Sequence, residues 1–308
     1  MSYAGSWLWP SLHTSRKGRA AVVGAYKPRG FYQRIGPLIL LLTKGVGGSV
    51  ARFAGLALMV AAMAILAKPV ALLAAYETRF RSFDAKGVEI HFFVEGSGEP
   101  VVLIHGLYSS AEINWRMTGV VAKLAEHHQV IAFDLPGHGH SDRPENEDAY
   151  GLQIVEDIVL LLDHLKIDKA HIVGYSVGGM VALKFLAKHP GRSLSGTIGG
   201  MGWLRAGRPL QGFWDRMPAP EGRRTPPAFI QSVGKLAMTE EELKKIEVPV
   251  EVLIGDRDPV KRMYVVPLQQ VRKDWPVVDI KDAGHISCII KKQFREEIAA
   301  WVRKQEKR

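Results

Sequence analysis

A glycine-rich turn around Ser176 limits the fold of this chain more narrowly than any other stretch. Residues 174–179 read GYSVGG and lie between an apolar run at 171–173 and a helix-patterned run at 180–186. A G-x-S-x-G turn between a strand and a helix strains the serine backbone and presents its hydroxyl, because the flanking small residues let both elements approach closely. The pattern predicts a nucleophilic Ser176, with the amide of Val177 directed at a developing oxyanion. A turn with a passive serine is the alternative, since five-residue patterns recur by chance.

Three further motifs accompany this turn. Residues 101–107 form an apolar run that ends in His-Gly-Leu, residues 133–142 are a strand end that breaks into a Gly-Pro turn, and residues 282–285 read DAGH. Together with the serine turn, and in this order, they resemble the α/β-hydrolase family over about residues 80 to 305. The resemblance implies an α/β fold, in which helices flank an eight-stranded, mostly parallel sheet. It also implies a Ser-acid-His triad and no required cofactor, but names no substrate.

The acid and the base of that triad follow two later strands. The apolar run at 248–254 ends in GDRDP, where the resemblance implies Asp258 as the acid and leaves Asp256 as the fallback. His285 lies on the loop beyond the last predicted strand. Because the carboxyl ends of parallel strands converge on one crevice, Ser176, Asp258 and His285 are expected to meet there.

The loop after the first central strand is expected to supply a second oxyanion donor. In the family, the amide after the His-Gly pair completes the oxyanion hole, which implies Leu107 beside Val177 here. His105 itself is interpreted as a structural histidine that hydrogen-bonds this loop.

The turn at 134–142 carries further polar residues. Asp134 is predicted to be a structural hydrogen-bond acceptor rather than the triad acid. His138 and His140 are predicted to be solvated loop residues rather than ligands, and no metal site is expected.

Alternation of strand and helix patterns extends over the rest of the body. An antiparallel hairpin at the sheet edge is predicted over residues 81–94, and helical spacing appears at 111–127, 150–165 and 289–302. A capping box at 239–242 predicts a helix start.

From residue 201 to about 238 this alternation breaks down, because five prolines prevent long helices. The family places its cap over the active site at this position, and a stretch this short indicates a small lid. Aromatic residues here are expected to give an apolar substrate pocket, although packing of the lid to the body explains them almost equally well. The pocket candidates are Tyr175, Trp203, Phe213 and Trp214.

The basic charge of the chain is concentrated at its amino terminus. The 308 residues carry a formal net charge of +10, yet nine basic residues and no acidic residue precede Glu77. Without those nine, 32 basic residues face 31 acidic ones, so the body is nearly neutral, and no motif indicates nucleic-acid binding. Cys288 is the only cysteine, which excludes an intrachain disulfide.

Residues 53–76 are predicted to form a transmembrane or signal-anchor helix. Their apolar run, interrupted only by Lys68-Pro69, has the length of a span of about 20 residues. The basic and poorly ordered segment 1–52 would then be cytoplasmic, and the hydrolase domain at 80–305 would lie on the other side of the membrane. A cleaved signal peptide, an organellar transit segment and an internal start such as Met59 remain alternatives.

The function expected from these features is that of a membrane-anchored serine hydrolase. It would cleave an apolar carboxylic ester through an acyl-enzyme. A carbon-carbon bond hydrolase, a cofactor-free haloperoxidase or perhydrolase, and an acyltransferase would use the same triad. A catalytically silent hydrolase fold that serves as an anchored binding module is the alternative of another class. The acyl and alcohol groups and the oligomeric state stay open.

Overall fold

The computed structural model describes residues 81–217 and 225–306. The predicted basic segment at 1–52 and the predicted hydrophobic helix at 53–76 lie outside the described residues. Within the described ranges, no helix combines the length and the apolar character needed to cross a bilayer.

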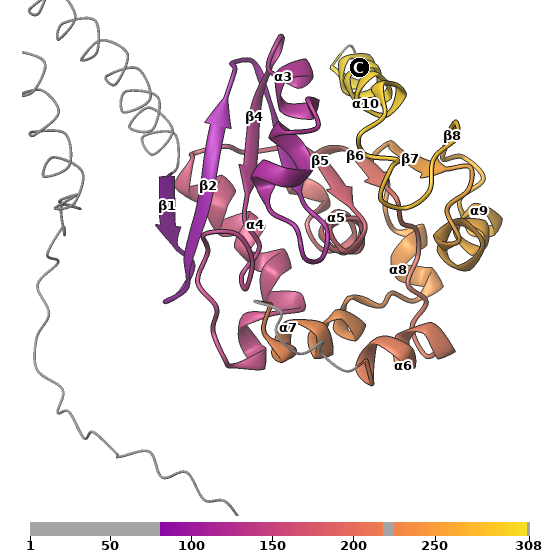
Figure 1. Cartoon of the computed structure of the whole chain (residues 1–308), viewed down its shortest axis with the longest axis horizontal. Coiled ribbons are helices and arrows are strands. Elements are labelled where there is room, and N and C mark those ends of the chain that lie inside the picture. Colours follow the sequence, from indigo (N-terminus) through magenta and orange to yellow (C-terminus); the bar gives the residue numbers. More distant parts are fainter. Residues whose placement is uncertain (1–80, 218–224, 307–308) are drawn as a thin grey trace, which may run out of the picture. The chain divides into compact units, whose positions relative to one another are not determined.

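A single eight-stranded sheet forms the centre of the described body, in the order β1-β2-β4-β3-β5-β6-β7-β8 (Figure 1). Only the pairs β1–β2 and β2–β4 are antiparallel, and all other neighbours run parallel. The predicted α/β-hydrolase fold with a mostly parallel sheet is therefore confirmed, with the hairpin at its edge. The strands are β1 (Arg81–Asp84), β2 (Glu89–Glu95), β3 (Glu99–Ile104), β4 (His128–Phe133), β5 (Ala170–Tyr175), β6 (Ser193–Gly199), β7 (Val250–Gly255) and β8 (Val277–Ile280).

Helices of very different lengths connect these strands. The three longest, α4, α5 and α10, cover the sheet, and most of the others are single turns that shape the loops. The helices are η1 (Glu112–Arg116), α3 (Val120–Leu124), η2 (Glu147–Ala149), α4 (Leu152–His164), α5 (Val177–Lys188), η3 (Pro190–Arg192), α6 (Pro209–Asp215), α7 (Pro227–Ser232), η4 (Val233–Leu236), α8 (Glu240–Lys244), η5 (Lys261–Val265), α9 (Val266–Val271) and α10 (Lys292–Gln305).

One predicted helix is wrong. The helical spacing at 111–127 corresponds to two short pieces, a π-helical turn η1 and the helix α3, separated by Gly119 with φ 80°. A left-handed residue ends a right-handed helix, so the chain changes direction at this glycine. The capping box predicted at 239–242 is present and begins α8.

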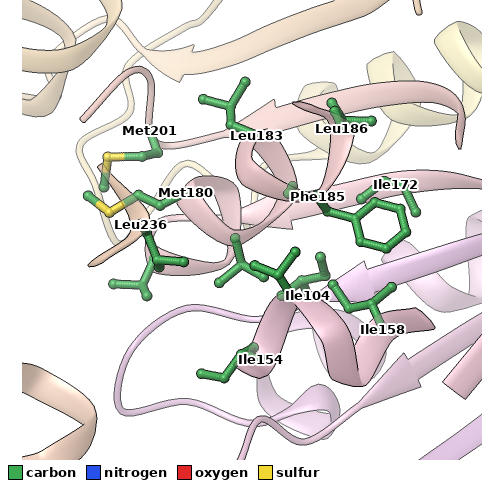
Figure 2. Close-up of a cluster of buried hydrophobic side chains, with 14 of the residues drawn as sticks. Ile104, Ile154, Ile158, Ile172, Met180, Leu183, Phe185, Leu186, Met201 and Leu236 are labelled. Atoms are coloured by element: carbon green, nitrogen blue, oxygen red, sulfur yellow. The ribbon is translucent and has the colours of Figure 1, made fainter. Parts of the chain in front are cut away.

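The hydrophobic core lies on both faces of the sheet. Along β3, Val102 and Ile104 belong to one buried cluster, whereas Val101 and Leu103 belong to the other. Because neighbouring residues of a strand face opposite sides, both sides must be covered, which explains the uninterrupted apolar run of this strand. Figure 2 shows the first cluster, where Ile104 packs with side chains of α4 and α5 such as Phe185.

The described parts of the segment from Met201 to Met238, residues 201–217 and 225–238, contain short helices beside the carboxyl ends of the strands. The segment contains α6, α7 and η4, which follow the lower edge of the molecule in Figure 1. A β-bridge between Arg205 and Met238 closes its base, and the indole N–H of Trp203 donates to the Met238 carbonyl at 2.8 Å. Both ends of this cap segment are therefore held together at the body.

Candidate active site

Ser176 stands on a strained turn between β5 and α5. Its φ of 56° and ψ of −122° place it outside the conformations that L-residues prefer, as a nucleophile elbow requires. Glycines make this turn sterically possible: a Cβ at Gly174 would lie 2.1 Å from the Gly178 carbonyl oxygen, and one at Gly178 would lie 2.1 Å from that of Ile104. The strand, the turn and the helix can approach each other only without these side chains.

The side chains predicted as the triad form one continuous hydrogen-bonded chain. Ser176 Oγ lies 3.0 Å from His285 Nε2, and His285 Nδ1 lies 2.8 Å from Asp258 Oδ2. A carboxylate can only accept, so Nδ1 carries the proton and Nε2 accepts from the serine hydroxyl. This is the tautomer that lets His285 remove the proton of Ser176.

The two aspartates after β7 have different partners. Asp258 has a fully buried side chain, and its second oxygen accepts from the Val260 amide at 2.9 Å. Asp256 instead accepts from the amides of Asp282 and Ala283 at 3.1 Å, and these hydrogen bonds, chiefly that from Ala283, lower its pKa. Asp258 therefore orients the imidazole, whereas Asp256 holds the loop that leads to it.

Two backbone amides near Ser176 are free to bind an oxyanion. Val177 is the first residue of α5, where helix geometry leaves the N–H without an intrahelical acceptor. Within the described residues, neither this amide nor that of Leu107 donates a hydrogen bond. The preceding Gly106 packs against the turn, because a Cβ there would lie 3.1 Å from the Ser176 Cβ.

The oxyanion loop is held by a residue that sequence reasoning missed. Asn114, in η1, accepts from the Gly106 amide through Oδ1 at 2.8 Å. His105 is a structural histidine, as interpreted from the sequence: its Nδ1 donates to the Gly106 carbonyl at 2.8 Å, and its Nε2 accepts from the Leu135 amide at 3.0 Å. Burial lowers the pKa of His105 and favours this neutral form.

The turn after β4 contains one residue whose predicted environment is wrong. Asp134 accepts from the amides of Ala111 and His140 at 2.8 and 2.9 Å, which agrees with a structural role. His140 is exposed, but His138, which was expected to be solvated, is only 3% exposed. Spacing along a loop gives no sign of the cap segment that covers His138, so its burial could not be foreseen.

His138 connects this turn to the cap segment. Its ring packs at 4.6 Å from that of Phe229 in α7, and its Nε2 lies 3.2 Å from the Thr225 hydroxyl. Burial, followed by the neighbouring His105, lowers the pKa of His138 to about 3. The neutral imidazole therefore accepts from the threonine hydroxyl.

The predicted pocket residues occupy three different environments. Trp203 and Trp214 are buried at 3% and 8% exposure, and the indole of Trp214 donates to the Tyr264 hydroxyl at 3.1 Å. Phe213 is 52% exposed beside Trp214. The two tryptophans thus hold the cap segment to the body, which is the packing interpretation weighed above.

Tyr175, the fourth pocket candidate, lies buried next to His285. Its hydroxyl donates to the His285 carbonyl, and its ring centroid lies 5.9 Å from the imidazole and 5.5 Å from Phe294. Burial raises its pKa, so it stays a neutral donor. Its contacts are those of a residue that positions the histidine loop.

A second Ser-His-acid chain lies near the amino ends of the central strands β3, β5 and β6, away from Ser176 at the carboxyl end of β5. His171 Nδ1 lies 2.7 Å from Ser195 Oγ, and its Nε2 lies 2.9 Å from Glu99 Oε2. His171 and Ser195 are each 1% exposed. Its members are far apart in sequence and follow no motif, so no sequence signal could have found it.

The arrangement around Ser176 has the parts that nucleophilic acyl transfer needs: a presented hydroxyl, an oriented base and free amides. In the described part of the chain, no group of histidine, cysteine or acidic side chains has the geometry to hold a metal ion. Burial raises the pKa of Cys288 to about 12, which makes its thiol a poor nucleophile.

Comparisons with known proteins identify the family to which this chain is similar. The alpha/beta hydrolase fold family matches residues 99–224. The 2-hydroxy-6-oxo-2,4-heptadienoate hydrolase of Pseudomonas putida is 30% identical over 220 residues, which cover 67% of this chain and 75% of that protein. Among solved structures, a bacterial membrane phospholipase A is similar with a TM-score of 0.59 and 25% identity, over 82% of this chain and 98% of its own. A bromoperoxidase from Bacillus anthracis has a TM-score of 0.60 at 19% identity, over 73% and 99% of the two chains, and shares the fold.

Proposed function

Because the chain belongs to the α/β-hydrolase family, we propose that it is a serine hydrolase that cleaves apolar carboxylic esters through an acyl-enzyme. The hydrogen-bonded chain from Ser176 through His285 to Asp258, next to two free amides, is the observation that carries this proposal. An aspartate at the elbow would instead favour alkyl transfer, which needs a carboxylate nucleophile.

In the first step, His285 Nε2 takes the proton of Ser176 as the serine oxygen forms a bond to the ester carbonyl carbon. Asp258 stabilises the imidazolium that results, through the hydrogen bond to Nδ1. The imidazolium then gives its proton to the alkoxide that leaves, so an alcohol departs and the acyl group stays on Ser176.

Negative charge on the carbonyl oxygen is stabilised by the amides of Leu107 and Val177. Loss of one such donor typically costs about 3 to 4 kcal/mol of transition-state stabilisation. Water then attacks the acyl-enzyme with His285 as the base again, which releases the acid and restores the hydroxyl.

The apolar character of the substrate is supported by the surroundings of the site. Exposed apolar side chains such as Ile286 lie on the loops that flank the proposed nucleophile. The similarity to a membrane phospholipase A supports a lipid ester as the substrate. In this proposal the cap segment at 201–238 acts as a small lid, with Phe213 as its most exposed aromatic side chain.

A carbon-carbon bond hydrolase is the second candidate. It is favoured by the relative from Pseudomonas putida, whose name specifies 2-hydroxy-6-oxo-2,4-heptadienoate as its substrate. The same triad would attack a ketone carbonyl instead of an ester. Such a substrate carries a carboxylate, so it would also need a cationic partner in the pocket.

The experiment that tests the proposal is labelling of the full chain with a fluorophosphonate. Labelling that disappears in Ser176→Ala supports the serine hydrolase. No labelling of folded protein would contradict it and would favour a silent binding module. Hydrolysis rates for p-nitrophenyl esters of increasing chain length, compared with the rate for 2-hydroxy-6-oxo-2,4-heptadienoate, then separate the two catalytic candidates.

The amino-terminal sequence adds a proposal on location. The apolar run at 53–76 would anchor the chain in a membrane, with the hydrolase domain on the non-cytoplasmic side. Protease digestion of intact and opened cells checks this: a non-cytoplasmic domain is cleaved before the membrane is opened.

A further inference from the structure

Exposed large apolar side chains occur in the connections that follow the strands of the described sheet. Nine such side chains are exposed in the described residues, and each lies in a segment that leaves the carboxyl end of β3, β4, β6, β7 or β8. Two of them are tied to the serine turn by their neighbours in sequence: Ile286 follows His285, whose Nε2 lies 3.0 Å from Ser176 Oγ, and Ile113 precedes Asn114, which accepts from the Gly106 amide.

Four of these side chains form what we call the apolar rim. Ile113 and Met117 come from η1 and its end, and are 54% and 74% exposed. Ile286 and Ile290 come from the loop after His285, and are 86% and 61% exposed. Large apolar side chains with so much exposure are costly in water, and where they cluster they commonly mark an interaction surface.

The two segments that carry the rim are joined beneath it. Trp115 of the first segment and Ile289 of the second belong to the same buried cluster. Beside them, Arg295 Nη1 donates to the Thr118 carbonyl at 3.4 Å, and the stem of the same arginine covers Gly119. The two segments that carry the rim therefore share a core and are tied to each other by Arg295.

Two lysines without a described ion-pair partner follow the rim directly. Lys291 and Lys292 directly follow Ile290, and neither forms an ion pair with another described residue. The acidic residue inside the rim, Glu112, is already paired with Arg116. A surface that combines exposed apolar side chains with unpaired lysines matches the boundary between the headgroups and the acyl chains of an anionic bilayer.

We propose that the apolar rim docks on an anionic lipid surface, so that Ser176 faces an ester presented by that surface. Lysine is depleted in protein–protein interface cores, whereas it is favoured at charged lipid surfaces, so the two lysines favour lipid over a protein partner. The inference gives a partner to the proposed ester hydrolase, and only its substrate side rests on that function.

The first test does not depend on activity. In the full chain with Ser176→Ala, an Ile290→Cys variant is labelled with an environment-sensitive nitrobenzoxadiazole dye. Cys288 is buried, so the chain without the new cysteine is the control for labelling. Vesicles of phosphatidylcholine with about one third phosphatidylglycerol are expected to shift the emission to the blue, because the dye leaves water. Pure phosphatidylcholine is expected to give a weaker shift.

A matched control separates the rim from anchoring elsewhere in the chain. Ala300→Cys places the same dye on an exposed position of α10, ten residues further on, and is expected to give no shift. No shift at Ile290→Cys would overturn the proposal. Blue-shifted emission before vesicles are added would also overturn it, since the rim would then be covered by another part of the chain or by a second copy.

The second test concerns turnover. The double variant Met117→Gln with Ile290→Gln is expected to lose about tenfold in activity on an ester held in the anionic vesicles. Its activity on soluble p-nitrophenyl acetate is expected to stay within about twofold of the unmodified chain. Lys291→Gln and Lys292→Gln are each expected to weaken the anionic preference by about fivefold.

The outcomes distinguish the two proposals. Equal loss on both substrates, or no loss on either, would contradict the lipid surface. No turnover of any ester would contradict the proposed function, and the dye measurement would still decide on the docking. Thermal melting shows whether the double variant is folded.

Discussion

Two Ser-His-acid chains lie at opposite ends of the central strands of the sheet. Only one of them has the surroundings of an active site. Ser176, His285 and Asp258 meet at the carboxyl edge, while Ser195, His171 and Glu99 meet at the amino edge. In both, a carboxylate fixes the protonated nitrogen of an imidazole, and the other nitrogen accepts from a serine. The side-chain chemistry is thus nearly the same.

The difference lies in the backbone. Ser176 stands on a strained turn with φ 56°, next to two amides that donate to no described group. Ser195 is an ordinary strand residue with 1% exposure, and the amide of the following Gly196 already donates to Pro249 at 2.9 Å. A substrate could neither reach Ser195 nor find a donor for its oxyanion there. Three side chains at hydrogen-bond distance are therefore insufficient for the proposed chemistry, and presentation of the hydroxyl distinguishes the proposed active site.

The largest effect is expected from a substitution in the proposed active site, at the carboxyl ends of the strands. Ser176→Ala is expected to reduce kcat by roughly 10⁴-fold or more, because the nucleophile is lost, while the melting temperature changes little. Ester turnover and thermal melting of the same preparation check both. A large loss of stability would mean that Ser176 has a structural role like that of Ser195.

Glu251 is a buried acid in the sheet region, but it binds a threonine hydroxyl, whereas Asp258 and Glu99 each bind a histidine. Glu251 is 3% exposed, and its oxygen accepts from the Thr197 hydroxyl at 3.0 Å. Burial raises its pKa from 4.5 to about 8. Between these values the folded chain keeps a proton that the unfolded chain releases, so the free energy of unfolding falls as pH rises from about 5 to 8.

Glu251→Gln removes this titration and keeps the acceptor for Thr197. The variant is expected to lose less stability between about pH 5 and 8, with a difference on the order of a few kcal/mol. Burial also raises the pKa of Asp157, to about 7, so urea unfolding must compare the two chains at each pH. If the free energies of unfolding of the two chains change in parallel with pH, Glu251 is ionised in the folded chain.

The next largest effect is expected from a substitution in the second Ser-His-acid chain, at the amino ends of the strands. Ser195→Ala leaves the buried Nδ1 of His171 without its donor and is expected to lower the free energy of unfolding by about 2 kcal/mol. Ester turnover is expected to stay within about twofold. Ser193→Ala, on the same strand but bonded to a carbonyl, is the matched control. Loss of turnover in folded Ser195→Ala would contradict the assignment of function to one edge.

The smallest effect sharpens the role of Tyr175. Tyr175→Phe keeps the ring against Phe294 but removes the hydrogen bond to the His285 carbonyl. Loosening of the histidine loop is expected to lower kcat about fivefold with little change in KM. A rise in KM alone would instead support the pocket role that the sequence suggested.

Much of the sheet could be predicted from sequence because its central strands are buried on both faces and read as apolar runs. The α/β-hydrolase fold was predicted from motifs whose glycines answer a steric need, such as Gly178 against Ile104. Helix boundaries were less certain: spacing alone could not show that Gly119 divides the stretch from 111 to 127.

The surroundings of the site depended on contacts between distant residues. Asn114 binds the loop before Leu107, and His138 is buried by the cap segment, yet neither lies in a pattern that predicts this. The contacts of the aromatic residues predicted for the pocket could not be read from the sequence either. Spacing identified Trp214 as apolar mass, but only the fold shows that it packs on Tyr264.

The crowding at the start of α5 has a consequence for protein engineering. Replacing a helical glycine by alanine normally stabilises a protein by about 0.4 to 1 kcal/mol, which makes Gly178 an attractive target for a thermostable variant. A methyl group there would meet the Ile104 carbonyl oxygen at 2.1 Å and push the helix away from its neighbouring strand. A search for heat resistance should therefore leave this position untouched and begin at Gly191, where an added methyl group would meet no atom within 4 Å and φ is not positive.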